Sequence, residues 1–244
     1  MKLLKMNIPK SKLETIPEIE QVFFIQLMQF LNELNILQKC VIVSSNELGS
    51  LTTIEKRGQI SQAHFFIRTL VGKLYEAWKM INKNFINTQL YKEYENHLSQ
   101  KGKESLSELI ERFNDKNNII SLIRNKFAFH YDKEKIKEEV KKIPKEELLE
   151  IYISEHPVNC LYSLSDTIVN WSILNFIDPL NSQQAMDILV GDIAIKVSGW
   201  FQEFCVDCVY IIANKLGLNF IEVEIPEPLS IDEVKLSYFV RRAE

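Results

Sequence analysis

The sequence predicts an all-α fold with one small β excursion, and three observations support that expectation. Glycine is scarce, at seven of 244 residues, which is about 3% against a usual ~7%, so hairpin turns should be few. Two Thr-x-x-Glu capping boxes each precede a long segment of helix-forming residues. Apolar residues then recur at the three- and four-residue spacing of a helix face.

The two capping boxes predict the first pair of helices. Thr15 with Glu18 begins a helix expected over roughly residues 17–45. Thr52 with Glu55 begins a second helix, whose apolar face repeats at heptad spacing. That face comprises Ile60, Ala63, Ile67, Leu70, Leu74, Ala77 and Ile81. We expect the two helices to form an antiparallel hairpin.

Shorter helical segments are predicted in the middle of the chain. They cover roughly residues 88–99 and 103–113, and Asn118 is a plausible N-cap for the segment LIRNKFAFHYD at 122–132. The stretch that follows, KEKIKEEVKKIPKEELLE at 133–150, mixes both charge signs. Such mixing is more typical of a solvated helix face than of a binding tract.

The pattern changes over residues 151–164, where IYIS and CLYSL flank HPVN. Short β-prone segments around a proline-containing turn predict a two-stranded hairpin. Asn181 or Ser182 then caps a final long helix that extends to about Leu216. Gly217 follows at the position where a helix C-cap glycine belongs.

We expect one helical domain over residues 1–217, followed by a C-terminal extension, 218–244, that docks as an extended segment and a short helix. A net charge of −4 and a pI near 5.7 exclude a globally basic nucleic-acid binder, so polyanions must bind at a local patch. The sequence has no apolar run of membrane-spanning length and no secretory signal. Its four cysteines are too few for a disulfide scaffold. We therefore expect a cytoplasmic protein without membrane contact.

Metal and redox motifs receive little support from the sequence. Cys205 and Cys208 form a C-x-x-C pair inside an apolar helical run, without the second ligand pair of a structural zinc site, so core packing is the preferred interpretation. His64 is expected at the boundary of a helix's apolar face, His97 on the surface and His156 in a turn. Glycine-rich phosphate loops and the hydrolase nucleophile elbow are absent. No cofactor and no metal are expected.

Arg68 interrupts the apolar stretch FFIRTLV, and Glu76 follows two helical turns later. An arginine this close to a core face usually pairs with a carboxylate or reaches a ligand. A structural ion pair is the preferred interpretation, and contact with a ligand is the alternative.

The segment LIRNKFAFHYD places Arg124 directly before Asn125 and six residues before His130, one of only four histidines. On an ideal α-helix six residues rotate about 600°, so Arg124 and His130 would point about 120° apart. His130 continues an apolar stripe formed by Ile120, Ile123 and Phe127. The two ionisable groups can therefore converge only near a helix end or across an interface between two copies.

The stretch RNKFAFH resembles the motif of HEPN domains (higher eukaryotes and prokaryotes nucleotide-binding). That motif has an arginine followed by Asn, His or Asp, and a histidine after four to six intervening residues. LIRNKFAFHYD is most similar to the abortive-infection-associated branch of the superfamily, and the helical layout agrees over roughly residues 52–217. The N-terminal helix and the C-terminal tail lie outside the resemblance. The resemblance implies an up-and-down helical bundle.

The resemblance also implies a metal-independent endoribonuclease of a toxin or antiviral defence system, active as a homodimer whose two motifs face each other in a cleft. When RNA is cleaved by its own 2′-hydroxyl, a base takes that proton and an acid protonates the leaving oxygen. Histidine suits either role at neutral pH, and two copies of His130 would fill both. Arg124 would offset charge on the phosphoryl oxygens. Asn125 would orient the histidine or the scissile phosphate.

The implied partners are RNA, a second copy of the chain, and an antitoxin or a nucleotidyltransferase. The alternative function is a non-catalytic HEPN-like module that binds nucleotides, RNA or another protein. Its interaction surface would be the apolar face around Phe127 and Phe129. An unrelated helical protein is the third interpretation.

Overall fold

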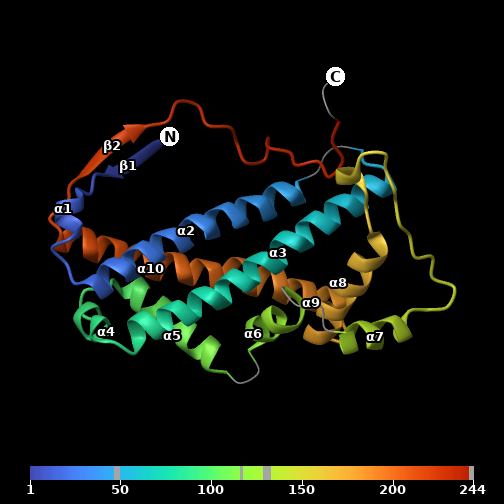
Figure 1. Cartoon of the computed structure of the whole chain (residues 1–244), viewed down its shortest axis with the longest axis horizontal. Helices are drawn as coiled ribbons and strands as arrows, with labels where there is room; N and C mark the ends of the chain where they lie inside the picture. Colours follow the sequence, from blue (N-terminus) through green and yellow to red (C-terminus); the bar gives the residue numbers. More distant parts are fainter. Residues whose placement is uncertain (47–49, 116–117, 129–132, 242–244) are drawn as a thin grey trace. The chain divides into compact units, whose positions relative to one another are not determined.

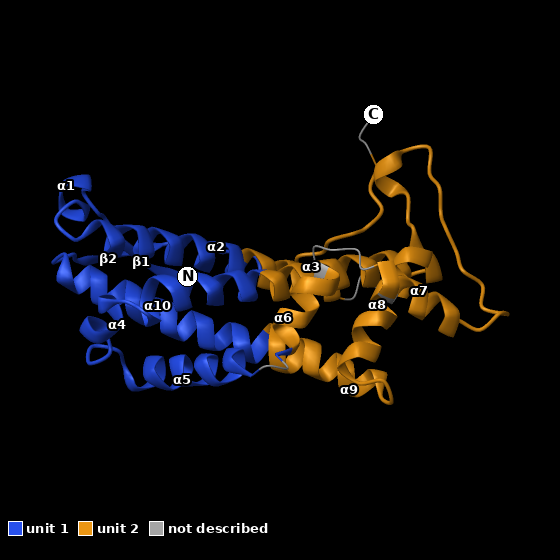
Figure 2. Ribbon diagram, turned by 60° about the horizontal axis from the view of Figure 1, so that its bottom comes forward, with its two compact units in different colours: residues 1–35, 73–118, 195–230 blue, residues 36–72, 119–194, 231–244 orange. Residues whose placement is uncertain are grey.

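The computed structural model describes residues 1–46, 50–115, 118–128 and 133–241. These residues are mostly helical, with a small two-stranded antiparallel sheet (Figure 1), which confirms the expected all-α character with a β excursion. Within the described ranges no helix is long and apolar enough to cross a membrane. The chain forms two compact units, and each collects segments from distant parts of the sequence (Figure 2).

The first unit comprises residues 1–35, 73–118 and 195–230. Its elements are β1 (Lys2–Met6), α1 (Lys10–Leu13), the start of α2 (Glu18–Ser45), the end of α3 (Thr53–Ile81), the π-helix η1 (Asn82–Ile86), α4 (Gln89–Tyr94), α5 (Gln100–Asn114), α10 (Ser198–Lys215) and β2 (Phe220–Glu224). Helices α5 and α10 pack along each other. The core of this unit is rich in aromatic side chains, including Phe23, Phe24, Phe85, Phe201 and Phe204.

A carboxylate of α10 fixes the start of α5. The Ser99 N–H donates to Asp207 at 2.8 Å, and the Ser99 hydroxyl accepts from the Gly102 N–H at 3.0 Å. A Cβ at Gly102 would overlap the Asp207 carboxylate and lie 2.9 Å from its Cγ. Glycine at this position therefore allows the two helices to approach closely.

A buried acidic side chain ties three helices of the first unit together. Glu20 of α2 is completely buried and forms an ion pair with Lys215 of α10 at 2.7 Å. The hydroxyl of Tyr94 donates to the same carboxylate from α4. Burial, and then the adjacent Glu20, raise the pKa of Tyr94 far above its usual value. The phenol therefore stays protonated and acts as a donor, which offsets the cost of burying the carboxylate.

The second unit comprises residues 36–72, 119–194 and 231–244. Its elements are the end of α2, the start of α3, α6 (Ile119–Ile123), the π-helix η2 (Arg124–Ala128), α7 (Lys133–Lys142), the 3₁₀-helix η3 (Pro157–Asn159), α8 (Ser163–Ile177), α9 (Ser182–Asp187) and most of the π-helix η4 (Ile188–Val197). Helix α8 packs against both α7 and α9.

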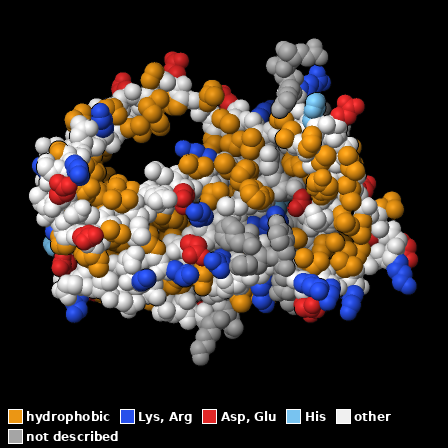
Figure 3. All heavy atoms as spheres, viewed as in Figure 1, with side chains coloured by type: hydrophobic (Ala, Val, Ile, Leu, Met, Phe, Trp, Pro, Cys, Tyr) orange, Lys and Arg blue, Asp and Glu red, His pale blue; other side chains and the backbone are white. Residues whose placement is uncertain are grey.

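Helix α7 is fixed to α8 by one buried carboxylate and is otherwise largely solvated. Glu139 accepts from Lys142 at 2.6 Å and from Asn175 of α8 at 2.9 Å. Lys137 and Glu134 form an exposed ion pair at 2.9 Å, and side chains of both charge signs lie over this helix (Figure 3). The expectation that the charged stretch is a solvated helix face is confirmed for α7.

Helices α2 and α3 form the expected antiparallel hairpin. Three polar links each join a later residue of α2, or of the turn after it, to an earlier residue of α3 or η1. They pair Gln26 with Asn84 at 2.9 Å and Glu33 with Lys73 at 2.8 Å in the first unit, and Gln59 with the Asn46 carbonyl in the second. The order of these pairs fixes the two chain directions as opposite.

Only one of the two predicted capping boxes forms. The N–H of Thr52 donates to the Glu55 carboxylate at 2.9 Å, and the Glu55 N–H donates back to the Thr52 hydroxyl at 3.3 Å. Thr15 instead donates its hydroxyl to the Lys12 carbonyl at 2.6 Å. The short helix α1, which the sequence did not suggest, thus takes the side chain that was expected to cap α2.

The predicted hairpin at residues 151–164 reduces to a single bridge. Tyr152 and Leu161 exchange two backbone hydrogen bonds, at 2.8 and 2.9 Å, and η3 fills the space between them. The two-stranded sheet instead pairs β1 with β2, in a register that places Lys2 opposite Glu224 and Met6 opposite Phe220. The prediction of a small β element was correct, but its position was wrong.

The last predicted helix is present but not uniform. The Asn181 side chain caps it by accepting from the Gln184 N–H at 3.0 Å, and Gly217 ends it with φ +58°. Between α9 and α10 the ten residues of η4 are π-helical. The short helix expected in the tail does not form in residues 225–241, which run as turns and extended chain.

Candidate functional site

The motif segment begins on a firmly buried helix and then widens. Ile120 and Ile123 of α6 are completely buried, and the π-helix η2 begins at Arg124. A π-helix closes its hydrogen bonds from i to i+5, and such segments are frequent at functional sites. The ideal α-helical rotation expected between Arg124 and His130 therefore does not hold over η2, because each π-turn takes more residues.

Arg124 and Asn125 lie in direct contact. The Arg124 Nη1 group donates to the Asn125 Oδ1 atom at 3.0 Å, and Arg124 is half-buried while Asn125 is exposed. A planar cation and an amide thus stand side by side at the start of η2. Both are groups that bind phosphate oxygens.

The next two residues are held by α8. The Phe127 ring centroid lies 6.1 Å from that of Phe176, and the Lys126 ammonium lies 5.0 Å from the Phe176 centroid. The third predicted site residue, His130, lies outside the described residues, as does Phe129. The structure therefore brings Arg124 and Asn125 together, and the complete three-residue site stays a prediction.

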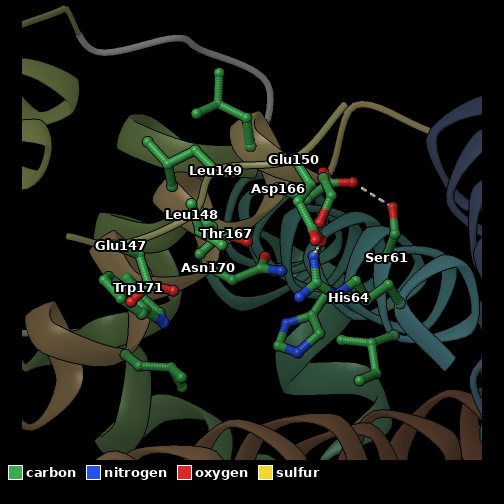
Figure 4. Close-up of a pocket in the computed structure, with 15 residues that line it drawn as sticks. Ser61, His64, Glu147, Leu148, Leu149, Glu150, Asp166, Thr167, Asn170 and Trp171 are labelled. Atoms are coloured by element: carbon green, nitrogen blue, oxygen red, sulfur yellow. Dashed lines mark hydrogen bonds and ion pairs between the residues drawn. The ribbon is translucent and has the colours of Figure 1, made fainter. Parts of the chain in front are cut away.

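A polar cluster that the sequence analysis missed lies between α3 and α8. The Arg68 Nη1 group donates to the Asn170 Oδ1 atom at 2.7 Å, and the Ser61 hydroxyl donates to the Asp166 carboxylate. Ser61 and Asp166 point toward each other, with Asn170 nearby (Figure 4). Arg68 follows Ser61 by seven residues and Asn170 follows Asp166 by four, so each pair shares a helix face.

His64 lies on α3 between Ser61 and Arg68 and is half-buried, as expected for a boundary position. Burial lowers its pKa, the charge of Arg68 lowers it further, and Asp166 acts in the opposite direction. The imidazole is therefore neutral at pH 7, and it can donate or accept a proton without first losing a charge.

Two hollows share Asp166 and Leu164 in their walls. The first, of about 350 Å³, is lined by Arg57, Ser61, His64, Glu150, Thr167 and Trp171, among others (Figure 4). Arg57 and Glu150 form an ion pair there. The second, also of about 350 Å³, is lined by Phe65, Arg68, Phe127, Ile136 and Val169, among others. The second hollow thus joins the motif-bearing helix η2 to Arg68 and Asp166.

Arg68 and Glu76 have partners that the sequence did not suggest. Arg68 donates to the amide of Asn170 on α8, and Glu76 lies 3.7 Å from Lys79 on its own helix. The predicted ion pair between Arg68 and Glu76 stays a prediction. The i, i+4 spacing of Asp166 and Asn170 was the available signal for the cluster, but α8 was not recognised as a helix.

The cysteine pair is part of the core, as expected. Cys205 and Cys208 are both completely buried in α10, and burial raises the pKa of each thiol well above its usual value. Protonated thiols are poor nucleophiles and poor metal ligands. Among the described residues no group of three or more His, Cys, Asp and Glu side chains is arranged to hold a metal ion.

Comparisons with protein-family models, curated proteins and solved structures find no match to this chain. Function must therefore be inferred from the motif and from local geometry.

Proposed function

We propose that the chain is a HEPN-like, metal-independent endoribonuclease of a toxin or antiviral defence system, acting in the cytoplasm as a homodimer. One observation carries the proposal. Arg124 and Asn125 are in contact at the start of a π-helix, in a segment whose sequence resembles the HEPN motif. Direct contact between guanidinium and amide is what joint binding of one phosphate requires.

The chemistry needs no redox step and no metal. One His130 accepts the proton of the RNA 2′-hydroxyl as its oxygen attacks phosphorus. The phosphorus–5′-oxygen bond breaks, and the second subunit's copy of His130 protonates the departing oxygen. Arg124 donates to the phosphoryl oxygens, where negative charge increases in the transition state. Asn125 holds the guanidinium in place through the 3.0 Å hydrogen bond.

The competing function is a non-catalytic module that binds RNA or a protein through the face around Phe127 and Phe129. Phe127 weighs against the protein-interaction version, because its ring packs against Phe176 and is half-buried. The RNA-binding version keeps every contact described above and lacks only bond cleavage. Cleavage therefore distinguishes the two functions.

The decisive experiment incubates the purified protein, freed of any co-purifying inhibitor, with total RNA in excess EDTA. We expect cleavage that disappears in His130→Ala and falls strongly in Arg124→Lys, because lysine keeps the charge but loses the planar donor pair. His97→Ala is the matched control, since His97 is exposed and lies in the other unit. Absence of cleavage by folded wild-type protein would reject the enzyme in favour of the binding module.

A subunit-mixing experiment tests whether the site is composite. Wild-type protein and His130→Ala protein are combined in equal amounts and allowed to exchange. If each site needs both histidines, activity falls to about one quarter of that of the same amount of wild-type protein, because only about a quarter of randomly exchanged dimers keep both. If each subunit acts alone, about half of the activity remains, which would reject the composite site.

A further inference from the structure

The second hollow has the wall chemistry of a nucleobase site. Two aromatic side chains line it: Phe65 of α3, which is 55% exposed, and Phe127 of η2. Two charged side chains of opposite sign, Arg68 and Asp166, line it as well. Unstacked RNA bases are typically bound in this way, with an aromatic ring on the base face and polar groups on its edges.

We propose that this hollow binds one guanine base of the RNA, next to the bond that is cut. The inference rests on the proposed ribonuclease function for the identity of the ligand as RNA, and on the lining residues for the identity of the base. Phe127 links the two, because it lies three residues after Arg124 on the same π-helix. A base in the hollow would therefore lie near the phosphate bound by Arg124.

Guanine matches the two charged groups better than the other bases. Its N1–H and N2–H₂ groups are adjacent donors that suit the two oxygens of the Asp166 carboxylate. Its O6 and N7 atoms are adjacent acceptors that suit a guanidinium such as that of Arg68. Adenine, cytosine and uracil do not offer two adjacent donors together with two adjacent acceptors.

Both charged groups are held in position by other side chains. Ser61 donates to Asp166 from the wall of the first hollow, and Asn170 accepts from Arg68 at 2.7 Å. Asn170 is buried, with 8% exposure, so it is a rigid anchor. Groups that are already oriented lose less conformational entropy on binding, which favours selectivity for one base.

The volume also suits a single base. About 350 Å³ is at the lower end of the range of small-molecule sites. It accommodates a purine ring with its hydration but not a folded nucleic acid. The exposed ring of Phe65 lies at the wall, where it can stack on an incoming base.

Binding of the four nucleoside monophosphates, measured by calorimetry or by ligand NMR, tests the proposal without any need for cleavage. We expect GMP to bind the full chain about tenfold or more tightly than AMP, CMP or UMP, as a bidentate pair at a base edge predicts. Asp166→Asn should abolish the preference for GMP. Phe65→Ala should weaken GMP by about 5- to 100-fold, because stacking is lost.

Glu147→Gln is the matched control. Glu147 is an exposed carboxylate that lines the first hollow and not the second, so its loss should leave the GMP preference unchanged. Phe65→Ala keeps the test decisive if Asp166→Asn fails to fold, because Phe65 is largely exposed. Equal binding of the four nucleotides, or a GMP preference that persists in folded Asp166→Asn protein, would overturn the guanine site.

Mapping of the RNA cleavage positions separates this inference from the proposed function. Cuts that fall beside guanine in wild-type protein, and lose that bias in Asp166→Asn, support both. Cuts with no base preference reject the guanine site and keep the ribonuclease. GMP-selective binding without any cleavage rejects the ribonuclease and leaves a guanine-binding module.

Discussion

Substitution of Asn170 by alanine tests the geometry that positions Arg68. Asn170 is buried, and its Oδ1 atom accepts from Arg68 Nη1 at 2.7 Å. Removing the amide leaves a half-buried guanidinium without this acceptor, and hydrogen bonds to charged groups contribute about 1.5–3 kcal/mol. For a chain of this size a loss of 1 kcal/mol lowers the melting temperature by about 2–4 °C. We expect a decrease of about 3–12 °C.

Urea unfolding of Asn170→Ala, Arg68→Met and the double variant measures how much of that loss belongs to the pair. Direct contact predicts a coupling free energy above about 0.5 kcal/mol, whereas independent sites add within that margin. Asn96→Ala is the control for an exposed asparagine and should leave stability unchanged. Additive effects of the two substitutions would refute the role of Asn170 as the anchor. With the anchor lost, the GMP preference should also fall, because Arg68 is no longer held in one orientation.

Three further predictions concern stability. Gly102→Ala should cost about 1–3 kcal/mol in urea unfolding, because its Cβ overlaps the Asp207 carboxylate, whereas Gly191→Ala, which meets no atom within 4 Å, should change stability by less than about 0.5 kcal/mol. Thr52→Ala should cost about 0.5–2 kcal/mol through loss of the capping box. The pKa of His64 is lowered in the folded protein, so the unfolded chain binds more protons there, and stability should fall as the pH drops below about 6.5. An NMR titration of His64 and a flatter pH profile in His64→Gln would verify this, and an NMR pKa of His64 above 6.5 would contradict it.

Sequence reasoning succeeded where the signal is local. Helix α3 carries its own capping box and a regular apolar face, so its start at Thr53 and its length follow from neighbouring residues. Helix α8 lacks such a signal, because apolar residues are distributed around its whole axis from Ser163 to Ile177. A helix of that kind has no preferred face in its sequence and is recognised only from its packing against α7 and α9.

The sheet could not be predicted for a different reason. Its strands are separated by more than two hundred residues, so nothing near Lys2 indicates that Glu224 will lie opposite. At residues 151–164 the β-prone composition was real. Pro157 begins a 3₁₀ turn there and has no N–H to donate to a ladder, so pairing stops after one bridge.

The candidate site divides along the same line. Arg124 and Asn125 are adjacent in the sequence, so a motif could find them. Asp166 meets Ser61 only when α3 packs against α8, which no single segment encodes. The same-face spacings on the two helices become informative only after both helices and their pairing are known.

The π-helix at the motif resolves a conflict within the sequence. In an α-helix Phe127 would lie only about 60° around the axis from Arg124, so that burial of the ring would pull the guanidinium toward the same packed surface. The wider turn of η2 rotates the two side chains further apart. Phe127 can then pack against Phe176 and line the second hollow, while Arg124 stays half-buried beside the exposed Asn125. The widening therefore separates the residues that anchor the segment from those that carry its charge, and this separation is what a phosphate-binding edge requires.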